Sequence, residues 1–279
     1  MCRAEESSVG FELRKIAGQE AISTMSDLSD KTVLLTGSSN GIGAATIKCL
    51  GDAGAFVVAH YNSDREGVEA ATKGISDSRK IIVQADFADL DQVEALWESA
   101  VSWRGSIDVL VNNAALMLWD GGFDKSLDIW DDVWQKTLAV NVLAPARLLR
   151  RAVNHFKEND GGTIITISSW SAQKGSTNSA AIAYGSSKAA IHAATQTIAR
   201  AYAKDGILAY LIAPGVVRTR LSEQFAATQG GEENITKTLA MGEWVPPEEV
   251  GALITFLASG RIRHLSGATL DINGASYIR

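Results

Sequence analysis

The sequence predicts an α/β fold, a doubly wound parallel sheet of about seven strands with helices on both faces. Short apolar runs alternate with helical segments along most of the chain. The first of these runs ends in a glycine-rich turn that leads directly into a helix. No internal repeat or low-complexity linker interrupts the alternation. Strands separated by helices pair in parallel through right-handed crossovers, which places helices on both faces of the sheet.

The expected strands are short aliphatic runs, which are typical of strands buried on both faces. In chain order they cover residues 31–37, 55–60, 80–84, 107–111, 163–167, 208–213 and 268–272. Between the third and fourth, residues 91–103 form an amphipathic helix with one apolar stripe. A long helical region, roughly residues 128–157, separates the fourth strand from the fifth.

Composition agrees with one enzyme domain, residues 25–279. The chain has 279 residues, 46% of them hydrophobic, which is enough for a large core. A net charge of −6 disfavours nucleic-acid binding, and no apolar run is long enough to span a membrane. Two cysteines and four scattered histidines predict neither a disulfide framework nor a metal site. Residues 1–24 lack a secretory signal, so we expect a flexible extension and a cytoplasmic protein.

A glycine-rich turn follows the first strand. Gly37, Gly41 and Gly43 have the spacing Gly-x-x-x-Gly-x-Gly, and an apolar helical segment continues to about Leu50. Glycine allows the backbone to turn tightly and to approach a pyrophosphate, while the helix presents unpaired N–H groups and a positive dipole end to that anion. The strand before and the helix after favour a dinucleotide site over a plain turn, and thus a Rossmann-type sheet.

Polar residues also follow the later strands. Ligands of doubly wound sheets bind beyond the carboxyl ends of the strands, where the strand order reverses. Each of these segments alone is an ordinary loop, but together they predict one cleft. They are Asp86 and Phe87 after the third strand, Asn112 to Ala115 after the fourth, Ser168 and Ser169 after the fifth, and Pro214 to Thr219 after the sixth.

Tyr184 and Lys188 lie four residues apart in a helical segment and so share one face. Free tyrosine has a pKa of about 10, and lowering it by roughly three units takes about 4 kcal/mol of extra phenolate stabilisation. A neighbouring ammonium and a cationic cofactor ring in a cleft of low dielectric can supply this. Without a nucleotide site, the same pair is a partly buried tyrosine beside a solvated lysine.

With these residues in view, the chain resembles the compact, single-domain branch of the short-chain dehydrogenases/reductases. The resemblance runs from about Asp30 to Ile278. It includes Thr36 before the glycine turn, Asn112–Ala115 with alanine where glycine is usual, and a closing segment with Asn273 where Asp is common. In general pattern the chain is most similar to 3-oxoacyl-(acyl carrier protein) reductases and related carbonyl reductases.

The resemblance implies an oxidoreductase that transfers a hydride between a nicotinamide cofactor and a small carbonyl or secondary alcohol compound. Its catalytic residues would be Asn141, Ser169, Tyr184 and Lys188. Tyr184 would be the general acid/base, and Ser169 would stabilise the oxyanion. Lys188 would lower the pKa of Tyr184 and bind the nicotinamide ribose, while Asn141 would hold a water that links Lys188 to solvent.

The cofactor site is expected to favour NADP(H) over NAD(H). A carboxylate near Tyr61 would favour NAD, and none stands there, whereas Asn62, Ser63 and Arg65 suit a 2′-phosphate. Against this, Asp64 adds a negative charge, and Arg65 can equally begin a solvated helix. With Tyr184 and Lys188, the expected cofactor-binding residues are Gly37, Ser39, Asn40, Gly41, Ile42, Gly43, Tyr61, Asn62, Ser63, Arg65, Asp86, Phe87, Asn113, Ala114, Pro214, Gly215, Val217 and Thr219.

The substrate side is less defined. Trp119 and Trp170 can line a cleft or simply pack, and residues 220–245, with two glycines as a hinge, are expected to form a mobile lid. Arg147, Arg150 and Arg151 allow three interpretations: a landing patch for an acidic carrier protein, a solvated surface, or the interface of a homodimer or homotetramer. The alternative function is a catalytically silent nucleotide-binding regulatory protein, whose mark would be a missing tyrosine or lysine.

Overall fold

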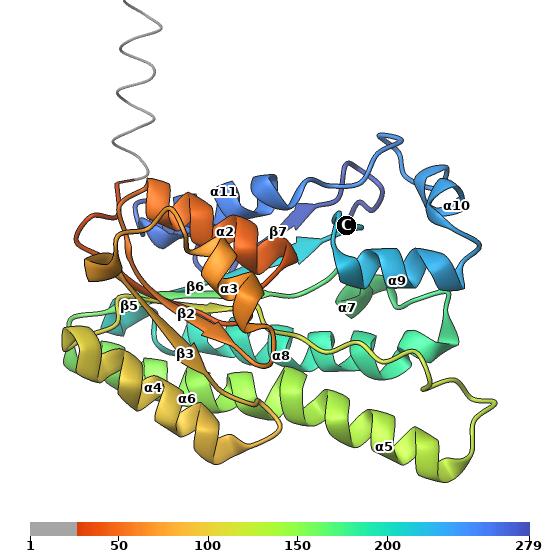
Figure 1. Cartoon of the computed structure of the whole chain (residues 1–279), viewed down its shortest axis with the longest axis horizontal. Coiled ribbons are helices and arrows are strands. Elements are labelled where there is room, and N and C mark those ends of the chain that lie inside the picture. Colours follow the sequence, from red (N-terminus) through yellow and green to blue (C-terminus); the bar gives the residue numbers. More distant parts are fainter. Residues whose placement is uncertain (1–26) are drawn as a thin grey trace, which may run out of the picture.

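A sheet of seven parallel strands runs through the middle of the molecule in the order β3-β2-β1-β4-β5-β6-β7 (Figure 1). The computed structural model describes residues 27–279, so the predicted extension 1–24 lies outside the described residues. The order reverses between β1 and β4, which confirms the doubly wound, Rossmann-type prediction. The strands are β1 Thr32–Leu35, β2 Phe56–Tyr61, β3 Lys80–Gln84, β4 Val109–Asn112, β5 Gly162–Ile167, β6 Ile207–Pro214 and β7 Thr269–Ile272.

Helices cover both faces of the sheet and bury two separate apolar clusters. On one face lie α2 Gly41–Asp52, α3 Arg65–Ala71 and α11 Pro247–Ala258; on the other lie α4 Leu90–Arg104, α6 Ala144–Glu158 and α8 Ile182–Ala201 (Figure 1). The residues of β1 and β4 are buried along their whole length, as expected for central strands packed on both sides. Helix α5, Leu127–Leu138, packs against α8.

The long helical region predicted at 128–157 is interrupted. A π-helical turn, Ala139–Leu143, separates α5 from α6, and the N–H of Ala144 bonds to the carbonyl of Ala139. Pro145 has no N–H and cannot donate an α-helical bond to the carbonyl of Asn141, so the chain widens here. The interruption lies where Asn141 contacts Leu116, in the loop that follows β4.

The predicted lid region is anchored at both ends. Val217 pairs with Val245 in a short bridge, and the N–H of Val245 donates to the carbonyl of Val216. The remaining short elements are α7 Ser171–Lys174, α9 Arg220–Thr228 and α10 Glu232–Thr236, with 3-10 turns at Asp77–Arg79, Ser179–Ala181, Ala203–Asp205 and Arg263–Leu265. Within residues 27–279, no helix combines the length and the apolar character needed to span a membrane.

Candidate active site

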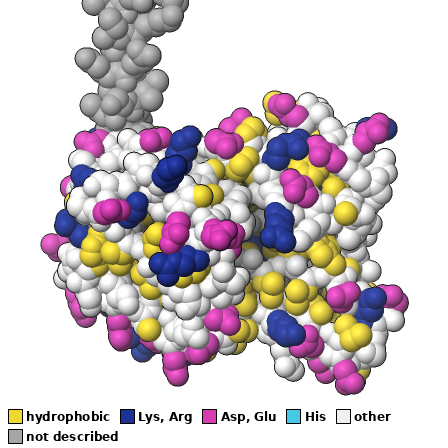
Figure 2. All heavy atoms as spheres, viewed as in Figure 1, with side chains coloured by type: hydrophobic (Ala, Val, Ile, Leu, Met, Phe, Trp, Pro, Cys, Tyr) yellow, Lys and Arg dark blue, Asp and Glu magenta, His cyan; other side chains and the backbone are white. Residues whose placement is uncertain are grey.

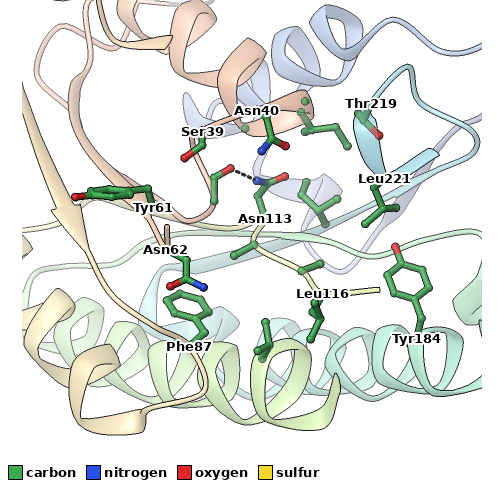
Figure 3. A pocket seen from close by; sticks show the side chains of 18 of the residues that line it. Ser39, Asn40, Tyr61, Asn62, Phe87, Asn113, Leu116, Tyr184, Thr219 and Leu221 are labelled. Atoms are coloured by element: carbon green, nitrogen blue, oxygen red, sulfur yellow. Dashed lines mark hydrogen bonds between the residues drawn. The ribbon is translucent and has the colours of Figure 1, made fainter. Parts of the chain in front are cut away.

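A cavity of about 550 Å³ lies at the carboxyl ends of the central strands (Figure 3). This volume is within the range of small-molecule and cofactor sites. The structure brings most of the predicted site residues to its walls, namely Gly37, Ser39, Asn40, Gly41, Ile42, Gly43, Tyr61, Asn62, Ser63, Asp86, Phe87, Asn113, Ala114, Ser169, Tyr184, Lys188, Pro214, Gly215, Val217 and Thr219. Two predicted residues, Arg65 and Asn141, are not among those that line the cavity.

The glycine turn brings backbone, at its glycines, and the side chains of Ser39 and Asn40 to the cavity (Figure 3). Gly41 has a φ of +52°, a conformation that L side chains rarely adopt, and a Cβ on Gly43 would lie 1.9 Å from the carbonyl oxygen of Gly37. The side chain of Asn40, at the N-cap of α2, makes no capping bond, and the first turn of α2 carries no acidic residue. The first N–H groups of α2 and its positive dipole end therefore remain available to a pyrophosphate.

A small network joins the ends of β1 and β4 beneath this turn. The hydroxyl of Thr36 donates to the carbonyl of Val111 at 3.2 Å and accepts from the N–H groups of Asn113 and Ala114 at 2.9 and 3.0 Å. The amide of Asn113 donates to the carbonyls of Thr36 and Gly37 at 2.9 and 3.0 Å. Asn113 thus holds the turn in place as well as lining the cavity.

His60, interpreted from sequence as a core or surface histidine, also lines the cavity and is 2% exposed. Its ring stacks on Phe87, with centroids 4.4 Å apart. The N–H of Gly37 donates to Nδ1 at 3.1 Å, so Nε2 carries the hydrogen and donates to the carbonyl of Ala85 at 3.0 Å. Burial lowers the pKa of His60 to about 4, so the ring is neutral at physiological pH. The sequence feature that could have predicted His60 at the cavity is its position directly before Tyr61, at the end of a strand.

Arg65 does not reach the cavity wall, contrary to its predicted role. Its Nε bonds to Glu69 Oε1 at 2.8 Å, one turn along α3, and its side chain is 71% exposed. Asp64 caps the same helix by accepting from the N–H of Gly67 at 2.9 Å. An arginine at the start of a helix finds its nearest carboxylate four residues on, which explains the difference.

Tyr184 and Lys188 project from α8 toward the end of β5. Figure 3 shows the phenol oxygen of Tyr184 directed into the cavity, toward the side where Leu221 and Thr219 lie. Lys188 is 4% exposed, and its ammonium donates to the carbonyl of Ile167 at 2.7 Å. The spacing of four residues on one helix thus brings both side chains to the same cavity.

The pKa of Tyr184 differs from expectation. Burial raises it to about 12, and the Ser169 hydroxyl opposes this shift. Lys188 does not lower it in this arrangement, because its ammonium lies 5.8 Å from the centre of the tyrosine ring and is bonded to a backbone carbonyl. Burial also lowers the pKa of Lys188, to about 8. Both shifts have one cause, the cost of placing a charge away from water.

Asn141 is buried and supports the loop after β4. Its Oδ1 accepts from the N–H of Leu116 at 2.7 Å, and its Nδ2 donates to the carbonyl of Leu116 at 2.7 Å and to the hydroxyl of Ser187 at 3.0 Å. Both amide hydrogens are therefore used. The side chain thus positions Leu116, and the water-holding role of Asn141 stays a prediction.

Other cavity residues carried no sequence signal. Leu116 and Leu221 line the cavity from a loop and from α9, and neither belongs to a polar strand end. Ser168 was noted after the fifth strand and is bonded to His192 Nδ1 at 3.0 Å. Ala88, Lys136, Val140 and Ile167 also line the cavity and were not predicted, whereas Ala115 belongs to the predicted cleft, Ser222 to the predicted lid and Asp64 to the segment expected near the cofactor.

Comparison with known proteins agrees with this geometry. A family profile described as Enoyl-(Acyl carrier protein) reductase matches residues 37–275. The 3beta-hydroxysteroid dehydrogenase 1 of Eggerthella lenta is 34% identical over 257 residues, which cover 89% of this chain and 94% of that protein. The chain belongs to the short-chain dehydrogenase/reductase family. As such it is an NAD(P)-dependent oxidoreductase, and the resemblance in sequence is confirmed.

Other similar proteins are named for different compounds. The L-rhamnose 1-dehydrogenase (NAD(P)(+)) of Azotobacter vinelandii is 33% identical over 257 residues, covering 90% of this chain and 98% of that protein. A short-chain dehydrogenase/reductase of Serratia marcescens superposes with a TM-score of 0.79 at 31% identity, covering 90% of this chain and all of that one. The 3-ketoacyl-(acyl-carrier-protein) reductase of Brucella melitensis, complexed with NADH, superposes with a TM-score of 0.77 at 26% identity. The match covers 89% of this chain and 98% of that one.

The cavity fits the nicotinamide cofactor that the family uses. The uncapped first turn of α2 suits a pyrophosphate, and a Cβ on Gly41 would lie 2.8 Å from Thr219 Cγ2, so the turn and the loop after β6 pack together only with glycine here. Ser169, Tyr184 and Lys188 line another part of the same cavity. One elongated ligand can therefore reach from the glycine turn to Tyr184.

Proposed function

We propose that this protein transfers a hydride between a nicotinamide cofactor and a carbonyl or secondary alcohol carbon, with Tyr184 as general acid/base. The observation that supports this is the phenol of Tyr184 pointing into the same cavity that the glycine turn lines, beside Ser169 and Lys188. The alternative, a catalytically silent regulatory protein, is not favoured. The relatives of this chain are dehydrogenases and reductases, and both Tyr184 and Lys188 are present.

In this proposal each side chain has one task. Tyr184, with its pKa raised to about 12, holds its proton at neutral pH and donates it to the substrate oxygen. Ser169 donates a hydrogen bond to that oxygen as negative charge develops. Lys188, fixed to the carbonyl of Ile167, presents its ammonium to the ribose side of the cavity. The bound cofactor supplies the hydride to the carbonyl carbon and, once oxidised, a positive charge near the phenol.

Replacing Tyr184 by phenylalanine tests this role. We expect Tyr184→Phe to lower kcat by about 10²–10⁴, the usual contribution of a positioned acid/base, with the Kd for NADPH unchanged. Turnover is followed by NADPH absorbance and binding by its fluorescence. Tyr202→Phe, at the end of α8, is the matched control and keeps wild-type kcat. Full activity of Tyr184→Phe would reject the role, and binding without turnover across a broad ketone panel would favour the regulatory protein.

For the cofactor we propose a preference for NADP(H) over NAD(H). The support is the wall beside the end of β2, where Asn62 and Ser63 line the cavity and no carboxylate stands at Tyr61. The carboxylate of Asp64 is engaged with the N–H of Gly67, which draws it toward α3. Comparing kcat/KM for the two cofactors is the test, and a strong NAD preference would overturn the choice.

We further propose a homodimer or homotetramer formed through α5 and α6. Leu127 on α5 and Leu143 in the π-helical turn between the two helices are 71% and 53% exposed. Arg147 and Arg151 are paired with Glu94 of α4, which removes two charges from a landing patch for an acidic carrier. Light scattering gives the subunit number, and a monomer at micromolar concentration would reject this. The single domain 25–279 and a cytoplasmic location stay predictions.

A further inference from the structure

One wall of the cavity beyond Tyr184 is an unusually apolar loop. Six consecutive apolar residues, Ala114–Trp119, follow Asn113 and form neither helix nor strand. Leu116 lines the cavity and is held there by both bonds from Asn141 to its backbone. Connecting loops usually run over the surface, where solvated polar residues predominate. A loop of this composition, fixed at a cavity, provides apolar contact area for a ligand.

The opposite wall is a face of α9. Leu221 lines the cavity, and Phe225 lies one turn later on the same face. Phe225 and Trp170 pack against a third apolar cluster formed by Val216, Ala226, Ile235, Leu239 and Trp244. Trp170 directly follows Ser169 and lies 3.3 Å from the position of a Cβ on Gly215. Apolar surface therefore surrounds the catalytic tyrosine on the substrate side.

The two walls meet through a pair of aromatic rings. Trp119 and Phe225 stack with centroids 5.5 Å apart and planes inclined by 24°. In Figure 2 hydrophobic side chains gather in the hollow between α9 and α5, where this loop runs. The buried Nε1 of Trp119 has no hydrogen-bond partner among the described residues. Trp119 lies three residues after Leu116 and Phe225 one turn after Leu221, so the stack adjoins the cavity wall that these two leucines form.

We infer that the substrate is a secondary alcohol or ketone borne on a bulky apolar ring system, bound against Leu116, Leu221 and the adjoining Trp119–Phe225 stack. This deepens the proposed function and rests on it. Large flat aromatic side chains offer contact area to a ring at little cost in conformational entropy. A sugar places a hydroxyl on nearly every carbon, and each would lose its water against the Ala114–Trp119 loop without gaining a partner.

The test compares alcohols oxidised in the same direction by the full-length enzyme. The probes are decahydro-2-naphthol, which is bicyclic and apolar, L-rhamnose and D-glucose as sugars, and 2-propanol as a small alcohol. We expect kcat/KM for decahydro-2-naphthol to exceed that for either sugar at least tenfold. A sugar oxidised as well as the bicyclic alcohol would overturn the inference while leaving the proposed function intact. No turnover of any probe, despite saturable cofactor binding, would overturn both.

Variants locate the effect in the aromatic walls. Trp119→Ala and Phe225→Ala are expected to raise KM for decahydro-2-naphthol at least fivefold, with KM for 2-propanol and the Kd for the cofactor unchanged. Trp103→Ala is the matched control, because Trp103 packs on Phe56 at the other end of the sheet. An unchanged KM for the bicyclic alcohol in both variants would also overturn the inference, since the ring would then lie elsewhere.

Discussion

The cavity has two halves, one around the glycine turn and one around α9, and their walls differ in the groups that form them. Around the glycine turn the wall contains backbone held by Thr36, Asn113 and His60, which bond to main-chain groups in β4 or directly after β1 and β3. Around α9 the wall is side chain, made by Leu116, the Trp119–Phe225 stack and other apolar residues. In the proposed function, the first half would recognise groups common to all nicotinamide dinucleotides, and the second would contact the substrate. Substrate specificity would then reside in the second half.

The largest expected effect on cofactor binding comes from breaking the backbone half. In Gly43→Ala the new methyl would lie 1.9 Å from the carbonyl oxygen of Gly37, so the turn must move. We expect the Kd for NADPH to rise about a hundredfold, or roughly 2.7 kcal/mol, by fluorescence titration. Gly74→Ala is the control, because a Cβ there meets nothing within 4 Å. Wild-type affinity in Gly43→Ala would show that the turn does not form the pyrophosphate site.

A second prediction concerns the pH dependence of the same half. The pKa of His60 falls from 6.5 to about 4 in the folded protein because the ring is buried, so only the unfolded chain takes up its proton between these values. The stability contribution is complete above pH 6.5 and is lost as the pH falls toward 4, by about 3 kcal/mol. Urea unfolding across this range measures it.

The control for this experiment is His60→Gln, which has no titrating ring. Partial burial also lowers the pKa of His155 and His192, so some pH dependence remains in the variant. The difference between wild type and variant isolates His60. Equal slopes of unfolding free energy against pH in the two proteins would contradict a buried neutral ring.

The smallest expected effect is on the stability of the side-chain half. Phe225 is only partly buried, at the edge of its apolar cluster, so Phe225→Ala should lower the free energy of unfolding by about 1 kcal/mol. Leu35 is fully buried beneath the glycine turn, so Leu35→Ala should lower the free energy of unfolding by about 2–5 kcal/mol. Urea unfolding of both variants compares the halves directly. Equal losses would mean that the substrate wall is as much a part of the core as the sheet.

Sequence patterns predicted the fold and most of the cavity because both depend on local regularities. Alternating apolar runs located all seven strands to within a few residues, and glycine spacing located the turn. The spacing of Tyr184 and Lys188 placed both on one face of α8. Their catalytic and cofactor-binding roles stay predictions until turnover is measured.

Contacts between segments distant in sequence could not be predicted. Asn141 bonds to the backbone of Leu116, and His60 joins the glycine turn to the end of β3, whereas the Arg65–Glu69 pair is local, four residues apart on α3. The pKa of Tyr184 is raised because burial outweighs the hydrogen bond with Ser169, and burial is a property of the packed chain.

Periodicity, glycine positions and helical spacing depend only on residues that are close together in the chain. The amino-acid sequence alone therefore determined the doubly wound sheet, the glycine turn and the shared face of Tyr184 and Lys188. The stacking of Trp119 on Phe225 joins residues far apart along the chain. Hydrogen-bond partners and dielectric surroundings exist only once such segments pack together, which is why folding, and no local pattern, set the charge states and the substrate wall.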